Sequence, residues 1–322
     1  MDIEDIRSAQ DRIRPYIKRT RLEFSETLST RVGAKVFVKY ELFQKTGSFK
    51  ARGAFNKLLL MTPEERSRGV VAVSGGNHAQ AVAYAATLLG IDPVIVMPES
   101  TPKNYVAATL EYGATVILKP SIAEAFNEVR HFQQKGRVFL HPFDDPEIMA
   151  GQGTVGAEII EDLPDTTDII VSIGGGGLAG GVATAVKSLK PDARIWGVET
   201  VGANAMSLAL EAGHPVELAA ITSIAKTLGA PHVSELTLGI AQKFVESVTL
   251  VSDSEALDAL RLLAERLKVI TEPAASCTLA AADKLRKKFT KESYVVLILC
   301  GGNISIDDIC RFATIFNAEK TS

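Results

Sequence analysis

The chain has 322 residues, with 35 Lys and Arg against 38 Asp and Glu, and a formal net charge of −3 at pH 7. This length fits roughly two domains of ordinary size, and a hydrophobic fraction of 46% beside 23% charged residues excludes disorder for most of it. Basic residues are scattered rather than clustered, so nucleic acid is not an expected partner. Neither a signal peptide nor a membrane span is expected, because the N-terminus is charged and the longest apolar run, Tyr294 to Cys300, falls far short of the roughly 20 residues that a bilayer requires.

The three cysteines, Cys277, Cys300 and Cys310, indicate neither a disulfide framework nor a structural zinc site. They are odd in number and show no C-x-x-C spacing. The five histidines form no i, i+4 pair, so a histidine metal site is not expected. We therefore expect a cytoplasmic protein in a reducing environment.

Short β-branched runs alternate with alanine-rich helical periods almost from end to end. This pattern is typical of βα units around a mostly parallel sheet and predicts an α/β fold. The expected strands are Lys35–Lys39, Val70–Val73, Pro93–Met97, Thr115–Leu118, Val138–Leu140, Asp168–Ile173, Arg194–Glu199 and Tyr294–Leu299. The expected helices are Arg52–Met61, His78–Leu89, Asn104–Tyr112, Ile122–Gln133, Val155–Glu161, Leu178–Ser188, Asp253–Leu267 and Thr278–Lys288. No linker rich in proline, serine or glycine separates two halves, so a second domain is expected to be inserted into the first.

Lys50 stands in the segment Ser48-Phe49-Lys50, where Ser48 is the expected helix cap and Lys50 falls in the first turn. A cation is unfavourable near the positive end of a helix dipole, so a lysine there suits a neutral amine that forms a Schiff base. Most lysines, however, are solvated surface residues. On these grounds alone Lys45 would be as good a candidate.

Two further turns follow expected strands. The segment Ser74-Gly75-Gly76-Asn77-His78 opens a helix and could bind a substrate carboxylate; alternatively, Ser74 or Asn77 could be a plain helix cap. The segment Cys300-Gly301-Gly302-Asn303 follows an apolar strand, where a buried structural cysteine is the ordinary interpretation. Such turns are where α/β proteins place their ligands.

Four consecutive glycines, Gly174 to Gly177, also lie between an expected strand and a helix. The N–H groups of such a turn can close on a phosphate, with the positive end of the helix dipole behind them. The same residues could instead serve a tight turn with close helix–strand packing. The spacing Gly175-x-Gly177-x-x-Gly180, with Glu199 at the end of the next strand, matches a dinucleotide fingerprint as well, so a nicotinamide-dependent oxidoreductase stays open.

Taken together, these four segments closely resemble the serine/threonine dehydratase family of pyridoxal-phosphate enzymes, the fold-type II group that includes serine racemase. The match runs in order from about Ile13 to Ile309. The resemblance implies two three-layer αβα domains with mostly parallel sheets: a large cofactor-binding domain of residues 1–57 and 142–322, and a small inserted domain of residues 58–141 that carries the substrate loop. It also implies pyridoxal 5'-phosphate as the cofactor, a small amino-acid substrate and a homodimer.

The resemblance assigns roles to individual residues. Lys50 carries the cofactor as an imine and then removes the Cα proton of the substrate, while Phe49 lies against the ring. Asn77 meets the ring hydroxyl, and Cys300 faces the pyridine nitrogen. The phosphate is held by Gly174, Gly175, Gly176, Gly177 and Leu178. The substrate is bound by Ser74, Gly75, Asn77 and His78, with Ser74 also catalytic and Phe143 a candidate wall of the substrate pocket or a core residue.

The expected activity is an α,β-elimination that converts a β-hydroxy-L-amino acid, with L-threonine and L-serine first, into a 2-oxo acid and ammonia. Phenylserine and 3-hydroxyaspartate stay open as substrates. Serine racemisation is expected as a side activity at most. Gly75 stands where racemases have a serine that donates a proton, and His141-Pro142-Phe143-Asp144 looks like the threonine dehydratases. A non-catalytic vitamin-binding sensor is a further alternative, against which the intact Lys50 and Asn77 argue.

The stretches Glu199–Ala203 and Ile221–Gly229 resemble serine dehydratases in which backbone carbonyls hold a monovalent cation. The residues so marked are Glu199, Ala203 and Leu228. Ala205 replaces an aspartate that some relatives offer to a divalent ion. Potassium is therefore the expected ion.

Overall fold

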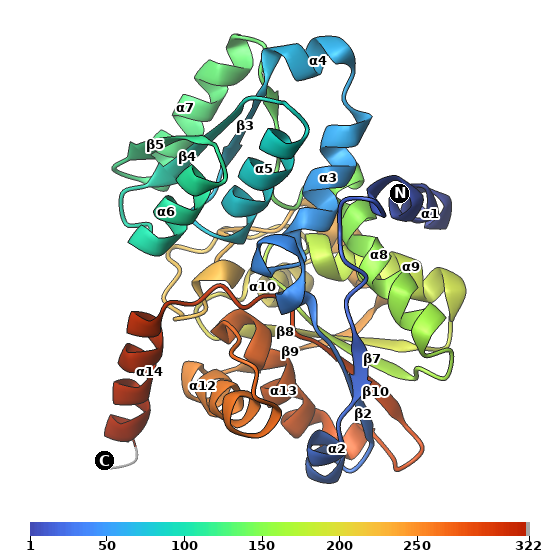
Figure 1. Ribbon diagram of the computed structural model, residues 1–322. Coiled ribbons are helices and arrows are strands. Elements are labelled where there is room, and N and C mark those ends of the chain that lie inside the picture. Colours follow the sequence, from blue (N-terminus) through green and yellow to red (C-terminus); the bar gives the residue numbers. More distant parts are fainter. Residues whose placement is uncertain (320–322) are drawn as a thin grey trace.

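The structure, a computed structural model that describes residues 1–319, contains two sheets (Figure 1). The larger sheet has the strand order β1-β2-β10-β7-β8-β9, in which every neighbouring pair except β1 and β2 runs parallel. The smaller sheet has the order β5-β4-β3-β6 and is parallel throughout. The strands are β1 (Leu22–Phe24), β2 (Lys35–Lys39), β3 (Val70–Val73), β4 (Pro93–Pro98), β5 (Thr115–Lys119), β6 (Val138–Phe139), β7 (Asp168–Ser172), β8 (Arg194–Thr200), β9 (Val245–Val251) and β10 (Tyr294–Ile298).

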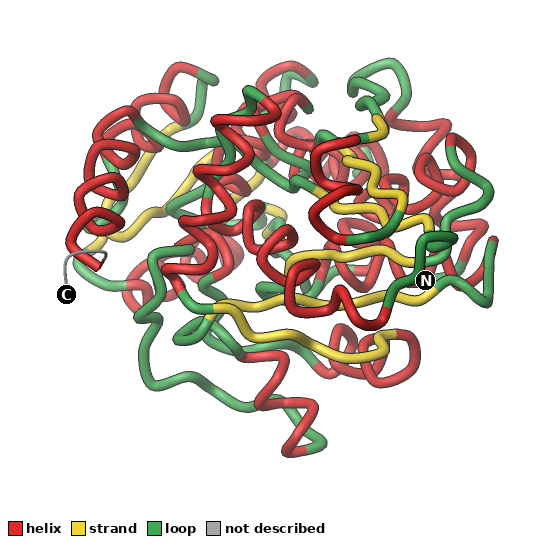
Figure 2. The backbone as a smooth tube through the Cα atoms, turned by 90° about the horizontal axis from the view of Figure 1, so that it is seen from below, coloured by secondary structure: helices red, strands yellow, loops and turns green. Residues whose placement is uncertain are grey.

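Helices lie on both sides of the strands (Figure 2). They are α1 (Ile3–Ile13), α2 (Glu26–Val32), α3 (Lys50–Leu60), α4 (Pro63–Arg68), α5 (Asn77–Leu88), α6 (Lys103–Glu111), α7 (Ile122–Gln134), α8 (Pro146–Asp162), α9 (Gly177–Leu189), α10 (Ala205–Ala212), α11 (Glu235–Phe244), α12 (Asp253–Leu262), α13 (Pro273–Leu285) and α14 (Ile306–Glu319). Short turns of 3-10 or π helix are η1 (Glu41–Phe43), η2 (Lys45–Gly47), η3 (Lys226–Leu228), η4 (Leu263–Leu267) and η5 (Arg286–Lys288). Among the described residues, no helix is both long and apolar enough to cross a membrane.

Each sheet is buried on both faces, which is why its strands are almost continuously apolar rather than alternating. Along β10, Val295 and Leu297 belong to one hydrophobic cluster, with α2, α12 and α13, whereas Val296 and Ile298 belong to another, with α8, α9 and α11. In the smaller sheet, α5 and α6 pack on one side and α7 on the other. The predicted α/β fold with two αβα units is thereby confirmed.

All eight predicted strands are present, but two further strands, β1 and β9, were not predicted. Both lie at the edges of the larger sheet, and their side chains are mostly exposed or half-buried, so they lack the apolar run of a central strand. The helices α1, α2, α4, α10, α11 and α14 were also not predicted.

The predicted start of α8 at Val155 is wrong, because the helix begins at Pro146. The glycine-rich stretch 151–156 hid it, since glycine is a poor helix former. Its glycines allow close packing: a Cβ at Gly151 would lie 2.6 Å from Gly53 Cα of α3, and one at Gly156 would lie 2.9 Å from the Val182 carbonyl oxygen of α9. Likewise, α13 begins at Pro273 instead of the predicted Thr278, with the proline in the first turn.

The four-stranded sheet lies between residues 70 and 139, inside the predicted small domain. The predicted boundary at 57/58 falls within α3, and the boundary at 141/142 falls in the loop between β6 and α8. The last three residues of the predicted large domain lie outside the described residues. The domain boundaries stay a prediction.

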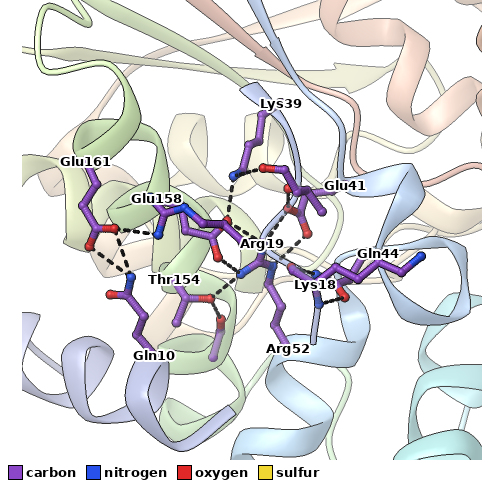
Figure 3. Close-up of polar contacts among 12 residues, drawn as sticks. Gln10, Lys18, Arg19, Lys39, Glu41, Gln44, Arg52, Thr154, Glu158 and Glu161 are labelled. Atoms are coloured by element: carbon purple, nitrogen blue, oxygen red, sulfur yellow. Dashed lines mark hydrogen bonds and ion pairs between the residues drawn. The ribbon is translucent and has the colours of Figure 1, made fainter. Parts of the chain in front are cut away.

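A buried ionic cluster joins α3 to the larger sheet and to α8 (Figure 3). The Arg52 guanidinium donates to both carboxylate oxygens of Glu41 at 2.8 Å and to both of Glu158 at 2.7 and 2.9 Å. Lys39 Nζ donates to Glu158 at 2.6 Å. Two cations thus face two carboxylates in a site without solvent contact, and this cluster fixes the first turns of α3, where Lys50 lies.

Candidate active site

Four helices begin near one another without a side-chain cap: α3 at Lys50, α5 at Asn77, α9 at Gly177 and α13 at Pro273. Contacts described below join these four starts. The first N–H groups of a helix have no partner within the helix, and together they present positive potential. An arrangement of several such ends favours an anionic ligand.

Lys50 is the first residue of α3 and so lies in its first turn, as predicted, although the helix was expected to begin at Arg52. Its Nζ donates to the Pro142 carbonyl oxygen at 2.6 Å and lies 5.2 Å from the centre of the Phe49 ring. Burial lowers the pKa of Lys50 to about 8, although the neighbouring Cys300 and Glu272 act in the opposite direction. A substantial fraction of the amine is therefore neutral near physiological pH, as a nucleophile or base requires.

The predicted cap at Ser48 is wrong. Ser48 is extended and pairs with Gly301 in an isolated β-bridge, and Phe49 occupies the cap position without any side-chain hydrogen bond. The loop is instead held by backbone bonds to the end of β10, since Phe49 N–H donates to the Cys300 carbonyl oxygen at 3.1 Å. The tertiary contact with β10 thus replaces local capping.

The loop of residues 174–177 runs from β7 into α9, and each of its glycines has a local reason. Gly176 has φ +92°, which favours glycine. A Cβ at Gly175 would overlap the Phe143 ring, and one at Gly177 would lie 3.0 Å from Phe143 Cβ. A Cβ at Gly174 would lie 3.0 Å from the Leu228 carbonyl oxygen. Close packing and an open N–H cradle therefore both apply, and Leu178 is buried in the first turn behind the loop.

Neither Ser74 nor Asn77 caps α5, so that alternative is wrong. The Ser74 hydroxyl accepts from Gly76 N–H at 3.1 Å. Asn77 is buried, and its Nδ2 donates to Glu272 Oε1 at 2.7 Å, which joins the start of α5 to the start of α13. At Gly75, a Cβ would lie 2.6 Å from the Thr101 hydroxyl, so the loop is closely packed there.

His78 and His141 lie near Lys50 as neutral rings. His78 Nε2 lies 2.9 Å from the Leu140 carbonyl oxygen, which can only accept, so Nε2 carries the proton. Burial lowers the pKa of His78 to about 3, and the nearby Lys50 lowers it further. Burial likewise lowers the pKa of His141 to about 4, although Asp144 acts in the opposite direction. Neither ring serves as a cation near neutral pH.

Cys300 lies two residues beyond β10 and is 4% exposed. Its Sγ donates to the Ala274 carbonyl oxygen at 3.7 Å. Burial raises the pKa of the thiol well above its ordinary value, so Cys300 stays an uncharged thiol. It lies near Lys50 and faces the start of α13.

Glu272 is a site residue that the sequence analysis missed. It is 3% exposed and directly precedes Pro273 at the start of α13. Burial raises its pKa to about 7, although hydrogen bonds from Asn77 and Thr227 and the charge of Lys50 lower it. The signal in the sequence was a lone Glu-Pro pair before a helix, which is too common to identify a site.

The three residues marked for a cation lie beside the glycine loop. Both Glu199 oxygens accept hydrogen bonds at the start of α10: Oε1 from Met206 N–H at 2.8 Å, and Oε2 from the N–H and the hydroxyl of Ser207 at 2.8 and 2.6 Å. Burial raises the pKa of Glu199 to about 7. Ala203 N–H donates to Thr200, and the Leu228 carbonyl oxygen faces Gly174. Within residues 1–319, His, Cys, Asp and Glu form no cluster of three or more that could hold a metal ion.

Residues 13–301 match the family model described as pyridoxal-phosphate dependent enzyme. The chain belongs to this family. Family membership decides against the dinucleotide interpretation of the glycine loop, and it confirms pyridoxal phosphate as the cofactor.

Relatives of known activity place the chain more closely within the family. The L-threonine ammonia-lyase of Thermotoga maritima is 41% identical over 311 residues, which are 96% of this chain and 77% of that protein. The catabolic L-threonine dehydratase of Escherichia coli K12 is 38% identical over 323 residues, which cover 98% of this chain and 97% of that protein. The predicted resemblance to the serine/threonine dehydratases is confirmed.

Solved structures of the family share the fold along nearly the whole chain. Maize serine racemase matches with a TM-score of 0.92 and 36% identity, covering 100% of this chain and 99% of that one. The processed threonine deaminase isoform 2 of Solanum lycopersicum matches with a TM-score of 0.92 and 32% identity, covering 98% of this chain and 87% of that one. The fold is thus common to racemases and deaminases, and only the site residues can distinguish the two activities.

Proposed function

We propose that this chain is a dehydratase that converts L-threonine or L-serine into a 2-oxo acid and ammonia. The observation that carries the proposal is the position of Lys50, a lysine with a lowered pKa, between the uncapped starts of α5 and α9. The two relatives described above, which are named for L-threonine, support threonine as the first substrate to test.

The residues present fit pyridoxal phosphate. Lys50 would hold the aldehyde carbon, and the N–H groups of residues 174–178 at the start of α9 would hold the phosphate. Asn77 would meet the ring hydroxyl, Phe49 would lie against the ring and Cys300 would face the ring nitrogen. When bound, the cofactor supplies an electron sink for the carbanion at the substrate Cα.

The remaining chemistry is proton transfer by residues of this chain. As a free amine, Lys50 Nζ takes the Cα proton. The same Nζ can return this proton to the β-hydroxyl, which leaves as water. The N–H groups at the start of α5, with the Ser74 hydroxyl, bind the substrate carboxylate. Hydrolysis of the released enamine consumes one water and gives the 2-oxo acid and ammonia, so L-threonine and L-serine lose no atoms other than those of ammonia.

The uncharged thiol of Cys300 favours elimination. A carboxylate at this position would hold a proton on the ring nitrogen and so stabilise a long-lived carbanion, whereas a thiol with a raised pKa carries no negative charge. Prompt loss of the β-hydroxyl is therefore favoured over amino-group transfer.

Racemisation is the second candidate, because maize serine racemase has a closely similar fold. It needs a proton donor on the face of the substrate opposite Lys50. Gly75 offers no hydroxyl there, and a serine at this position would have to displace the Thr101 side chain. The proposal therefore keeps racemisation as a side activity. Phenylserine and 3-hydroxyaspartate are further candidate substrates, and Phe143, which packs against the glycine loop, is the candidate wall of the pocket for their β-substituents.

Three finer proposals accompany the activity. A potassium ion held by Glu199 with the carbonyl oxygens of Ala203 and Leu228 would brace the glycine loop, since Leu228 already faces Gly174; a cation would also keep Glu199 ionised despite its burial. A homodimer and a cytoplasmic location are the other two. The free thiols in the described part of the chain agree with a reducing compartment.

The test is release of 2-oxo acid and ammonia by the purified protein with pyridoxal phosphate. The substrates are L-serine, L-threonine, their D-forms, threo-3-hydroxyaspartate and phenylserine, with the enantiomers followed in parallel. Release from L-threonine or L-serine is expected. Interconversion of enantiomers without release of 2-oxo acid would favour the racemase. If the protein catalyses neither reaction, a non-catalytic sensor is favoured.

A further inference from the structure

Asn303 joins three segments near the start of α5. Its Nδ2 donates to the Thr46 carbonyl oxygen at 2.8 Å and to Asn77 Oδ1 at 2.7 Å. Its own backbone carbonyl oxygen accepts a hydrogen bond from the Tyr105 hydroxyl of α6. Asn303 therefore links the loop before α3 to two helices of the smaller sheet, α5 and α6.

The direction of these hydrogen bonds follows from which atoms can only accept. The Thr46 carbonyl can only accept, so the Asn303 side chain must turn its Nδ2 toward it. The same Nδ2 then faces Asn77, which must present Oδ1 to it. Asn77 Nδ2 is left to face Glu272, whose Oε1 accepts at 2.7 Å. One backbone carbonyl thus determines the orientation of two side-chain amides in succession.

Close packing keeps both ends of this chain of hydrogen bonds in place. A Cβ on Gly47, which has φ +72°, would overlap Asn303 Oδ1, and a Cβ on Gly301 would overlap Glu272 Oε1. Asn77 and Glu272 are 6% and 3% exposed, so water does not replace either partner readily. Asn77 accepts one hydrogen bond, from Asn303, and donates one, to Glu272. One of its two Nδ2 hydrogens is therefore left without a partner among these groups.

We infer that Asn303 and Glu272 are positioning residues that fix the Asn77 amide with a hydrogen-bond donor directed to the ring hydroxyl of the cofactor. This inference rests on the proposed cofactor contact of Asn77. A reversed amide would direct an oxygen to that hydroxyl, whose ionised form needs a donor. Neither residue need touch the reacting atoms for this role.

The substitution Asn303→Asp tests the direction of the bonds with little change of shape. A carboxylate cannot donate to the Thr46 carbonyl or to Asn77 Oδ1, so the Asn77 amide is expected to reverse. We expect the dissociation constant of pyridoxal phosphate, measured by equilibrium dialysis against apoprotein, to rise roughly 10- to 100-fold, the cost of an unpaired buried polar group. Glu272→Gln keeps an acceptor oxygen and should stay within about threefold of the unmodified protein, whereas Glu272→Ala should resemble Asn303→Asp.

A double-mutant cycle separates positioning from general damage to the fold. If Asn303 acts through Asn77, Asn303→Asp should have little further effect on the cofactor dissociation constant in an Asn77→Ala background. Equal effects in both backgrounds would overturn the inference and assign Asn303 a structural role. Thermal unfolding of each apoprotein identifies variants that fail to fold. If Asn303→Asp is one of them, the comparison of Glu272→Gln with Glu272→Ala tests the same inference.

The outcomes also distinguish this inference from the proposed function. If the unmodified protein binds the cofactor and Asn303→Asp binds it equally well, the inference is wrong while the proposed function stands. If the unmodified protein does not bind pyridoxal phosphate, both are wrong. Weak binding by Asn303→Asp and Glu272→Ala, with near-normal binding by Glu272→Gln, supports both.

Discussion

Lys50 Nζ donates a hydrogen bond to the Pro142 carbonyl oxygen at a distance of 2.6 Å, one residue before Phe143, which packs against the glycine loop. This contact holds the amine at the start of α3, where burial has lowered its pKa to about 8. We expect Lys50→Ala to lose both the visible absorbance of the bound cofactor and the release of 2-oxo acid, by more than a thousandfold. The matched control is Lys45→Ala, five residues earlier, which should keep both. Normal turnover by Lys50→Ala would remove Lys50 from the mechanism.

Cys300→Ser should keep the rate of 2-oxo acid release within about tenfold. A serine hydroxyl is uncharged and can hydrogen-bond to the same ring nitrogen, so the electronic character of the site is preserved. Cys277→Ser provides the control: Cys277 is also buried and shares the Ala274 carbonyl oxygen with Cys300, but it contacts the Ser172 hydroxyl and is assigned no contact with the cofactor. Complete inactivation by Cys300→Ser alone, measured under saturating cofactor, would contradict the proposed contact.

Arg52→Met should destabilise the protein by about 3–5 kcal/mol, because it leaves the buried carboxylates of Glu41 and Glu158 with one cation fewer. Urea unfolding of the apoprotein measures this loss. The control is Arg31→Met, which breaks the partly exposed ion pair with Asp283 and should cost less than about 1 kcal/mol. Equal losses in the two variants would mean that the buried cluster has no special role in stability.

Removal of monovalent cations should lower activity several-fold, because the carbonyl oxygens of Ala203 and Leu228 would repel one another without an ion between them. Activity is measured in a tetramethylammonium buffer of constant ionic strength, to which potassium, sodium or lithium is added. Potassium should restore activity best. Full activity without any small cation would exclude the cation site.

Glu272 should make the stability of the apoprotein depend on pH. Its folded pKa, about 7, lies above the ordinary value of 4.5, so the folded state binds the proton more tightly than the unfolded state does. The stability it contributes is complete below about pH 4.5 and is lost as pH rises to about 7. His78 and His141, whose pKa values are lowered, act with the opposite sign, so the quantity to measure is the difference in unfolding free energy between the unmodified protein and Glu272→Gln.

That difference should fall by a few kcal/mol between pH 4.5 and pH 7, at about 1.4 kcal/mol per unit of pKa, and stay level above pH 7. Urea unfolding at half-unit intervals of pH gives the curve. A difference that does not vary with pH would show that Glu272 titrates normally in the folded state.

The positions of the main elements could be predicted because they depend on neighbours along the chain. Apolar runs such as Val70–Val73 and the alanine-rich periods that follow them appear as β3 and α5 almost to the residue. Edge strands such as β9 could not be predicted, since their side chains are half exposed and carry no strong pattern. The predicted helix cap at Ser48 was wrong for a related reason: backbone pairing of Ser48 with Gly301, just beyond β10, replaces the side-chain hydrogen bond that a cap would make.

The α/β class and the glycine-bearing turns of the site follow from the sequence, because hydrophobic periodicity and backbone freedom are local properties. Lys50 was preferred to Lys45 only because its segment resembles the dehydratase family. Which residues meet at the starts of these helices depends on tertiary contacts. Asn77 meets Glu272 and Asn303, which lie 195 and 226 positions away along the chain. Such contacts depend on how the two sheets place the starts of α5 and α13 against each other, and a single buried glutamate has no periodic signature that would reveal them beforehand.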